Sequence, residues 1–144
     1  ALYGQADLLV KFSRSSATVA SSATGMLPIQ GYITNIGALK NTALTQQTDA
    51  FGDAWEEHSF VGVRRREPFD FTGFYDDVAA SGPHALFGNT TDIGAERYME
   101  VDKGSSDVEN GRVIIQSYQV APVRGELHQY TVSCLPTGTW ATVT

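Results

Sequence analysis

A pair of β-rich segments near the C-terminus places the strongest constraint on how this chain can fold. The segment GRVIIQSYQVAPV (111–123) is β-rich until Pro122. The segment ELHQYTVSCLPTG (126–138) alternates, with His128, Tyr130, Val132 and Cys134 on one side and Gln129, Thr131 and Ser133 on the other. Proline and glycine in the connection APVRGE (121–126) favour a turn. We therefore predict that these segments form one long β-hairpin.

The rest of the chain carries more strand signal than helix signal. Apolar runs and alternating patterns predict strands at 7–12, 29–37, 67–75 and 96–102. Residues 38–53 include strand-compatible positions but are mostly polar, and the small polar segment 13–25 is either a flexible arm or loop, or an edge strand. The sequence predicts one domain spanning 1–144, mainly β, with a β-sandwich or barrel-like sheet.

Helix signals are confined to two short stretches. In DAWEEHSF (53–60), Asp53 suits an N-cap and Glu56 follows three residues later, as a capping box requires. In PHALFG (83–88), Pro83 suits a first helical position and Gly88 suits a terminator. We expect one short flanking α-helix at 53–60 and a brief helical turn at 83–88.

The stretch FDFTGFYDD (69–77) combines aromatic residues with a pair of carboxylates. Phe69 and Phe71 share one strand face, and Gly73 permits a bulge after which Phe74 and Tyr75 both pack. Together with Trp55, these four aromatic residues are the predicted core anchors. Adjacent strand residues point to opposite faces, so Asp76 and Asp77 are interpreted as shaping the following loop rather than as a catalytic pair.

No arrangement of reactive side chains indicates catalysis or metal binding. The three histidines, His58, His84 and His128, lack ligand spacing, and the single cysteine, Cys134, lies in a β pattern typical of a buried small hydrophobe. Nucleophile-elbow, phosphate-loop and dinucleotide patterns are not found. We expect no enzyme activity, no cofactor and no metal. We also expect no membrane segment and no signal peptide.

The charge balance is acidic. A net charge of -6 argues against a protein that grips nucleic acid, since phosphate binding needs clustered lysine and arginine. Arg64, Arg65 and Arg66 form the one basic cluster, and Glu67 and Asp70 follow it closely. We interpret the three arginines as an edge that forms salt bridges between subunits.

Three segments in a fixed order resemble the major tail (tail tube) proteins of long-tailed, siphovirus-type bacteriophages. They are ITNIGALKNTALTQQTDAFGDAWEEHSFVGVRR (33–65), REPFDFTGFYDDVAASGPHAL (66–86) and RVIIQSYQVAPVRGELHQYTVSCLPTG (112–138). The resemblance implies a β-sandwich subunit that assembles with itself into rings, usually hexameric, which stack into a tube through which genomic DNA passes during ejection. It also implies other tail proteins at the tube ends, and a place in the virion tail after assembly in the host bacterial cytoplasm.

A sheet that lines a water-filled channel needs one polar face without positive charge. The candidate lumen-facing residues are Ser117, Gln119, Gln129, Thr131 and Ser133. The opposite rows, with Tyr118 and Val120 joining His128, Tyr130 and Val132, are expected to pack inward. A polar outward face also occurs on any one-sided antiparallel sheet, so both interpretations stay open.

Two other kinds of protein fit the same composition. The first is another small β-rich virion protein, either a capsid decoration protein or a tail terminator. The second is a carbohydrate-binding β-sandwich module, which would need an exposed aromatic platform such as Trp55 or Trp140 could provide.

Overall fold

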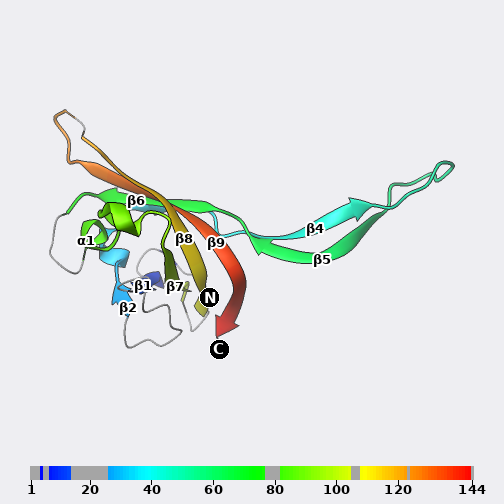
Figure 1. Cartoon of the computed structure of the whole chain (residues 1–144), viewed down its shortest axis with the longest axis horizontal. Helices are drawn as coiled ribbons and strands as arrows, with labels where there is room; N and C mark the ends of the chain where they lie inside the picture. Colours follow the sequence, from blue (N-terminus) through cyan, green and yellow to red (C-terminus); the bar gives the residue numbers. More distant parts are fainter. Residues whose placement is uncertain are drawn as a thin grey trace.

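A seven-stranded antiparallel sheet forms the body of the molecule, and a separate two-stranded hairpin projects from it (Figure 1). The computed structural model describes residues 4, 7–13, 26–76, 82–104, 108–122 and 124–143. The strand order in the large sheet is β2-β1-β7-β8-β9-β6-β3, and β4 pairs with β5 in the hairpin. The elements are β1 (Leu9–Ser13), β2 (Met26–Pro28), η4 (Gln30–Tyr32), β3 (Asn35–Ile36), β4 (Asn41–Gln47), β5 (His58–Arg66), β6 (Phe69–Phe74), α1 (Pro83–Phe87), η5 (Thr90–Asp92), β7 (Glu96–Asp102), β8 (Val108–Ala121) and β9 (Gln129–Val143).

The predicted C-terminal hairpin is the spine of this sheet. Strands β8 and β9 pair from Val108 opposite Val143 to Ala121 opposite Gln129. The second strand therefore runs beyond the end predicted at residue 138. A bulge places one extra residue of β8 between Ile115 and Ser117, which bends the hairpin midway along its length.

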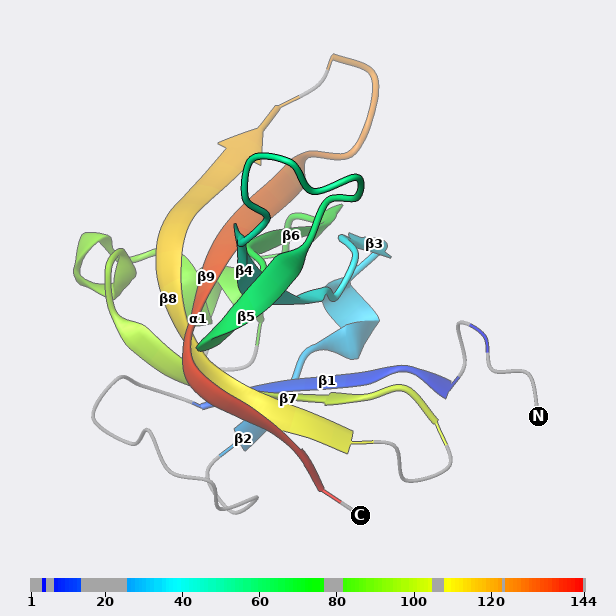
Figure 2. The ribbon, with the colours of Figure 1, turned by 90° about the vertical axis from the view of Figure 1, so that its right-hand side faces the viewer.

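The sheet curls so strongly that strands far apart in its order face each other. Three strands, β7, β8 and β9, lie between β1 and β6 in the sheet. The rings of Phe12 in β1 and Phe71 in β6 are nevertheless 5.6 Å apart. Figure 2 shows the long strands wrapping around the same interior. The predicted mainly β, barrel-like sheet is therefore confirmed, in the form of one curled sheet that encloses its own core.

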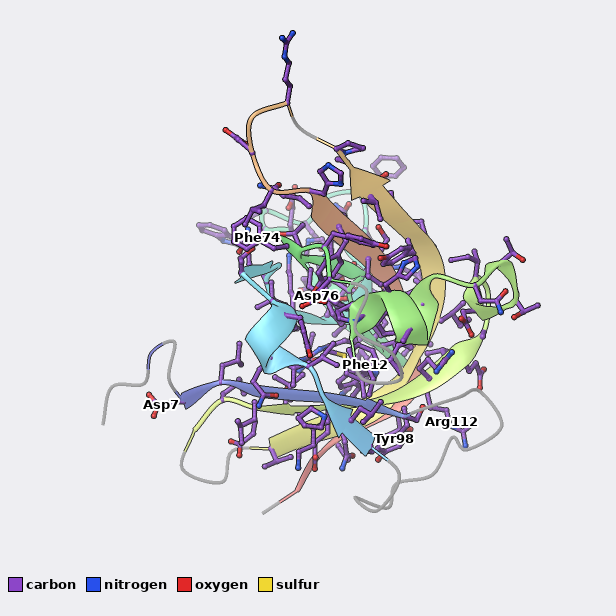
Figure 3. All side chains as sticks on the ribbon, turned by 90° about the vertical axis from the view of Figure 1, so that its left-hand side faces the viewer. Asp7, Phe12, Phe74, Asp76, Tyr98 and Arg112 are labelled. Atoms are coloured by element: carbon purple, nitrogen blue, oxygen red, sulfur yellow. The ribbon has the colours of Figure 1, made fainter. Side chains whose placement is uncertain are left out.

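Helix α1 covers the open side of the curl. Its Phe87 ring makes an edge contact with Phe12 at 5.2 Å and a second with Phe71 at 6.2 Å. Figure 3 shows Phe12 lying close to this helix. The helix begins at Pro83 and is followed by Gly88, as the sequence predicted for the turn at 83–88. The short flanking helix of the fold is thus α1.

The helix predicted at 53–60 is wrong. Asp53 does not cap a helix, because its Oδ2 accepts the N–H of Ala50 at 2.6 Å and closes a tight turn instead. From His58 onward the chain is strand β5, paired with β4, which lies within the mostly polar segment 38–53. A two-turn amphipathic helix would need an apolar surface to pack on, and no described part of the body covers this end of the hairpin.

The strand predicted at 29–37 is shorter than expected. Residues Gln30–Tyr32 form one turn of 3-10 helix, and only Asn35–Ile36 pair as β3. The turn brings the carbonyl oxygen of Tyr32 within 2.6 Å of the Tyr130 hydroxyl, which donates to it. In the segment 13–25, Ser13 ends β1 with its side chain buried, and residues 14–25 lie outside the described residues.

The aromatic strand β6 confirms part of the predicted core. Phe69 and Phe71 are buried, and Tyr75 is half-buried with its ring 5.1 Å from that of His84. The prediction that Phe74 packs in the core is wrong, because its side chain is 47% exposed. Strand β6 pairs with β9 without a bulge, so the regular alternation of the strand points Phe74 outward. Gly73 serves a different purpose from the one predicted, since a Cβ there would lie 1.8 Å from the Tyr32 carbonyl oxygen.

Candidate functional site

The five candidate lumen residues share one face of the sheet. Strand pairing sets Ser117 opposite Ser133 and Gln119 opposite Thr131, while Gln129 lies opposite Ala121. The alternate residues of β9, which include Tyr130 and Val132, are buried in the core. The structure thus groups the five as predicted; their facing a lumen remains a prediction.

Strand β6 continues this polar face on the far side of β9. Asp70 pairs with Ser133, Thr72 with Thr131 and Phe74 with Gln129. The polar face, defined as these outward residues of β6, β9 and the second half of β8, contains one carboxylate and no lysine or arginine. The polar face is therefore neutral to acidic, and it offers no positive charge that would attract the phosphates of DNA.

One edge of this polar face is unpaired. Strand β7 pairs with β8 between Val108 and Ile114, and the last contacts beyond that are two backbone bonds at Ile115. From Ser117 to Ala121, β8 pairs with β9 on one side, and no other strand in the described part of the chain lies against its second side. Five residues of open backbone edge lie beside the polar residues.

The inward side of the same hairpin is a tyrosine and histidine cluster. The rings of Tyr118 and Tyr130 stack at 6.1 Å, and the Tyr118 hydroxyl lies 3.2 Å from His84 Nδ1. Burial, and secondarily Tyr75, raises the pKa of Tyr118 to about 12. Burial also raises the pKa of Cys134, a free buried thiol as predicted. His128 is a correction, because it is exposed just before β9 begins.

The β4–β5 hairpin, residues 41–66, forms an arm that stands away from the body (Figure 1). In β5 every residue except Arg66 is exposed, and β4 is nearly as open. Leu44, Phe60, Val61 and Val63 are each between 42% and 49% exposed. A two-stranded hairpin is marginally stable in water by itself, and this arm has apolar surface that no described part of the chain covers.

The tip of the arm, residues 48–57, holds the aromatic residue that was misassigned to the core. Trp55 is 84% exposed, and Phe51 nearby is completely exposed. Trp140, the second tryptophan considered as a sugar platform, lies at the other end of the arm. Its ring covers Gly111, and the Arg66 guanidinium lies 4.9 Å from its centroid. The two tryptophans therefore do not form one binding platform.

The predicted arginine edge at the base of the arm is mostly paired within the chain. Arg66 is buried and donates to Glu109 at 2.5 Å, and Arg65 pairs with Glu67 at 3.0 Å. These two ion pairs are therefore intramolecular rather than between subunits. Arg64 is different, because its guanidinium lies over the Phe60 ring at 4.7 Å and has no carboxylate partner among the described residues.

Sites for catalysis or metal binding are not found in the described ranges. No group of three or more histidine, cysteine, aspartate or glutamate side chains there could hold a metal ion. Among the helices that the structure describes, none has the length and apolar character to cross a bilayer. The features that stand out are surfaces, namely the polar face, the open β8 edge and the arm.

Comparison with known proteins identifies the fold by structure and not by sequence. No protein family and no curated protein matches the chain in sequence. In structure, a chain from the tail of an empty gene transfer agent particle, refined helically with C6 symmetry, matches with a TM-score of 0.75 and 16% identity, covering 99% of this chain and 100% of that one. The chain has a tail-tube fold. A subunit of the SPP1 tail tube matches with a TM-score of 0.63 and 14% identity, covering 99% of this chain and 80% of that one.

A chain from the virion of the native gene transfer agent particle matches almost as well as the empty tail. Its TM-score is 0.72 at 15% identity, with 99% of this chain and 100% of that one covered. The two gene transfer agent matches cover 99% of this chain, so the compared region includes both the arm and the curled sheet. The fold that the sequence resemblance implied is therefore confirmed.

Proposed function

We propose that this protein is a structural virion subunit that assembles with itself into stacked rings, forming a tail tube through which genomic DNA passes. The single observation that carries this proposal is the arm, a long hairpin whose strands are exposed along nearly their whole length. Such an element becomes stable when other copies cover it. The tail-tube fold supports the same conclusion, since the matched chains come from tails.

The open edge of β8 supports ring formation. An unpaired strand edge is a template for pairing with another chain. The sheet's outermost strands, β2 and β3, have three and two residues, so these edges offer few backbone groups. The segment from Ser117 to Ala121 offers more, and it lies directly beside the polar face. Pairing between neighbours there would join the polar faces into one continuous wall. We propose six subunits per ring.

The polar face has the chemistry that a DNA conduit needs. A channel wall that bound phosphate would hold DNA back, whereas neutral and acidic side chains allow it to slide. Ser117, Gln119, Gln129, Thr131 and Ser133 would line this wall, with Asp70 adding negative charge. We propose that other tail proteins bind the tube ends, and that the subunits assemble in the host bacterial cytoplasm before they reside in the virion tail.

Electron microscopy of the purified protein, alone and with tail-initiating factors, tests this proposal. We expect long tubes with a central hole. A capsid decoration protein would instead give discrete trimers, and a tail terminator would give single rings that do not extend. Either of those results would overturn the proposed function.

A further inference from the structure

The two ends of the arm have opposite chemical character. The tip, residues 48–57, carries four carboxylates and no lysine or arginine; they belong to Asp49, Asp53, Glu56 and Glu57. The base carries three consecutive arginines at the end of β5. Because β4 and β5 are extended, about seven residue steps of roughly 3.3 Å separate the two ends. The tip of one chain therefore cannot reach its own base.

The tip offers groups that its own chain does not satisfy. Glu57 has no ion-pair partner in the described part of the chain, and Glu56 lies 3.7 Å from His58, a contact that is charged only when the histidine is protonated. Phe51 and Trp55 are exposed beside these carboxylates. The exposed rings of Phe51 and Trp55 would be buried against apolar walls, and the neighbouring carboxylates would pair with a positively charged side chain. A complementary pocket therefore needs apolar walls and an arginine or lysine without a carboxylate partner.

Such a pocket exists at the base of the arm. A hollow of about 830 Å³, here called the base pocket, lies between the arm and the end of β9. Its walls include Ala43, Pro136 and Trp140, which are apolar, and no carboxylate lines it. Arg65 and Arg66 are neutralised by Glu67 and Glu109, and Arg64 supplies the positive charge without a carboxylate partner in the described ranges.

We propose that the arm tip of one copy docks in the base pocket of a second copy, with Glu57 pairing to Arg64 and Trp55 packing against the apolar wall. This contact joins two different surfaces of the same chain, so it is heterologous and can repeat from copy to copy, in a closed ring or along an open polymer. The inference deepens the proposed function and rests on it for the polymer in which the contact occurs.

Charge favours this pocket over a second apolar hollow on the body. The second hollow lies beside Phe74 and Leu127 at the β8–β9 turn, and Glu126 lines it. Docking the acidic tip there would bring carboxylates of like charge together, which disfavours that partner. The base pocket offers Arg64 instead.

A charge exchange tests the pairing. Arg64→Glu and Glu57→Arg should each raise the critical concentration for tube formation at least tenfold, measured by sedimentation and negative-stain microscopy. The double variant, Arg64→Glu with Glu57→Arg, should return it to within about threefold of the native value, since the ion pair is restored with reversed sign. Arg124→Glu, which makes the same charge change on the exposed β8–β9 turn, is the matched control and should leave assembly unchanged. Single variants that assemble normally, or a double variant no better than either single one, would overturn the inference.

A cysteine cross-link separates this inference from the proposed function. The native Cys134 is buried, so cysteines introduced at Ala43 and Glu57 are the reactive thiols. A chain with both should form a ladder of disulfide-linked multimers under mild oxidation, whereas a chain with either one should stop at dimers. A ladder supports the docking whether or not tubes are seen. Tubes without a ladder would overturn the docking and leave the proposed function standing, and the absence of both would overturn both.

Discussion

Replacing Gly73 by alanine tests how the curled sheet is closed. A Cβ at this position would lie 1.8 Å from the backbone oxygen of Tyr32 and 2.9 Å from the ring of Tyr130. Tyr32 would have to move by more than about 1 Å, which costs about 1–3 kcal/mol in a packed interior. The move would also break the 2.6 Å bond from the Tyr130 hydroxyl, leaving a buried donor unsatisfied at a further cost of about 1–3 kcal/mol. We expect Gly73→Ala to lower the free energy of unfolding by about 2–6 kcal/mol, the sum of these two costs.

Urea denaturation followed by tryptophan fluorescence measures this loss on freshly purified subunits, before assembly. Gly31→Ala is the matched control, because a Cβ there meets nothing within 4 Å. It should change the free energy of unfolding by less than about 1 kcal/mol in either direction. If Gly73→Ala loses no more stability than this control, the close approach of Tyr32 does not close the sheet and the reasoning is refuted.

Three further perturbations probe the ion pairs, the arm and the polar face. Burial raises the pKa of Glu109, but the hydrogen bonds and charges of Arg66 and Lys103 together outweigh it and hold this pKa below its ordinary value. The contribution of Glu109 to stability is therefore complete above pH of about 4.5 and is lost as the pH falls through the lower folded value. Glu109→Gln should therefore cost about 3 kcal/mol of unfolding free energy at pH 7, with the difference from the native protein shrinking in denaturation curves taken below pH of about 4. Gly62→Ala should leave body stability within about 1 kcal/mol but reduce tube yield in sedimentation, because φ is +90° at the arm's bulge and alanine strains that conformation. Gln129→Lys should fold and assemble but slow DNA ejection in a salt-dependent way, timed with a DNA-binding dye; a variant that fails to fold would place this position inside the core instead.

The parts of the fold that the sequence predicts are those held by alternation and burial. Alternation over 126–138 identified the buried side of β9, and Phe69 and Phe71 were recognised as core residues. The position of α1 followed from Pro83 and Gly88. In each case local preference and tertiary packing agree, so the local pattern was sufficient.

The arm could not be predicted from the same signals. Its strands expose both faces, so the alternation of apolar and polar residues that marks a half-buried strand is missing. The capping pattern at Asp53 and Glu56 therefore suggested a helix, and Trp55 was assigned to a core that it never reaches. No described part of the chain covers Trp55, and the available signal was the FGD turn between two weak strand patterns. Phe74 was misplaced for a different reason, because Gly73 serves a close backbone approach rather than a bulge.

The location of the polar face in the assembled particle tests the account most directly. Gln119 is exposed on this face and the native cysteine is buried, so a Gln119→Cys variant carries one accessible thiol among the described residues. Assembled tubes of this variant can be labelled with a small maleimide gold cluster and imaged by electron cryomicroscopy. We predict label density inside the central channel. Label density on the outer wall would contradict the account.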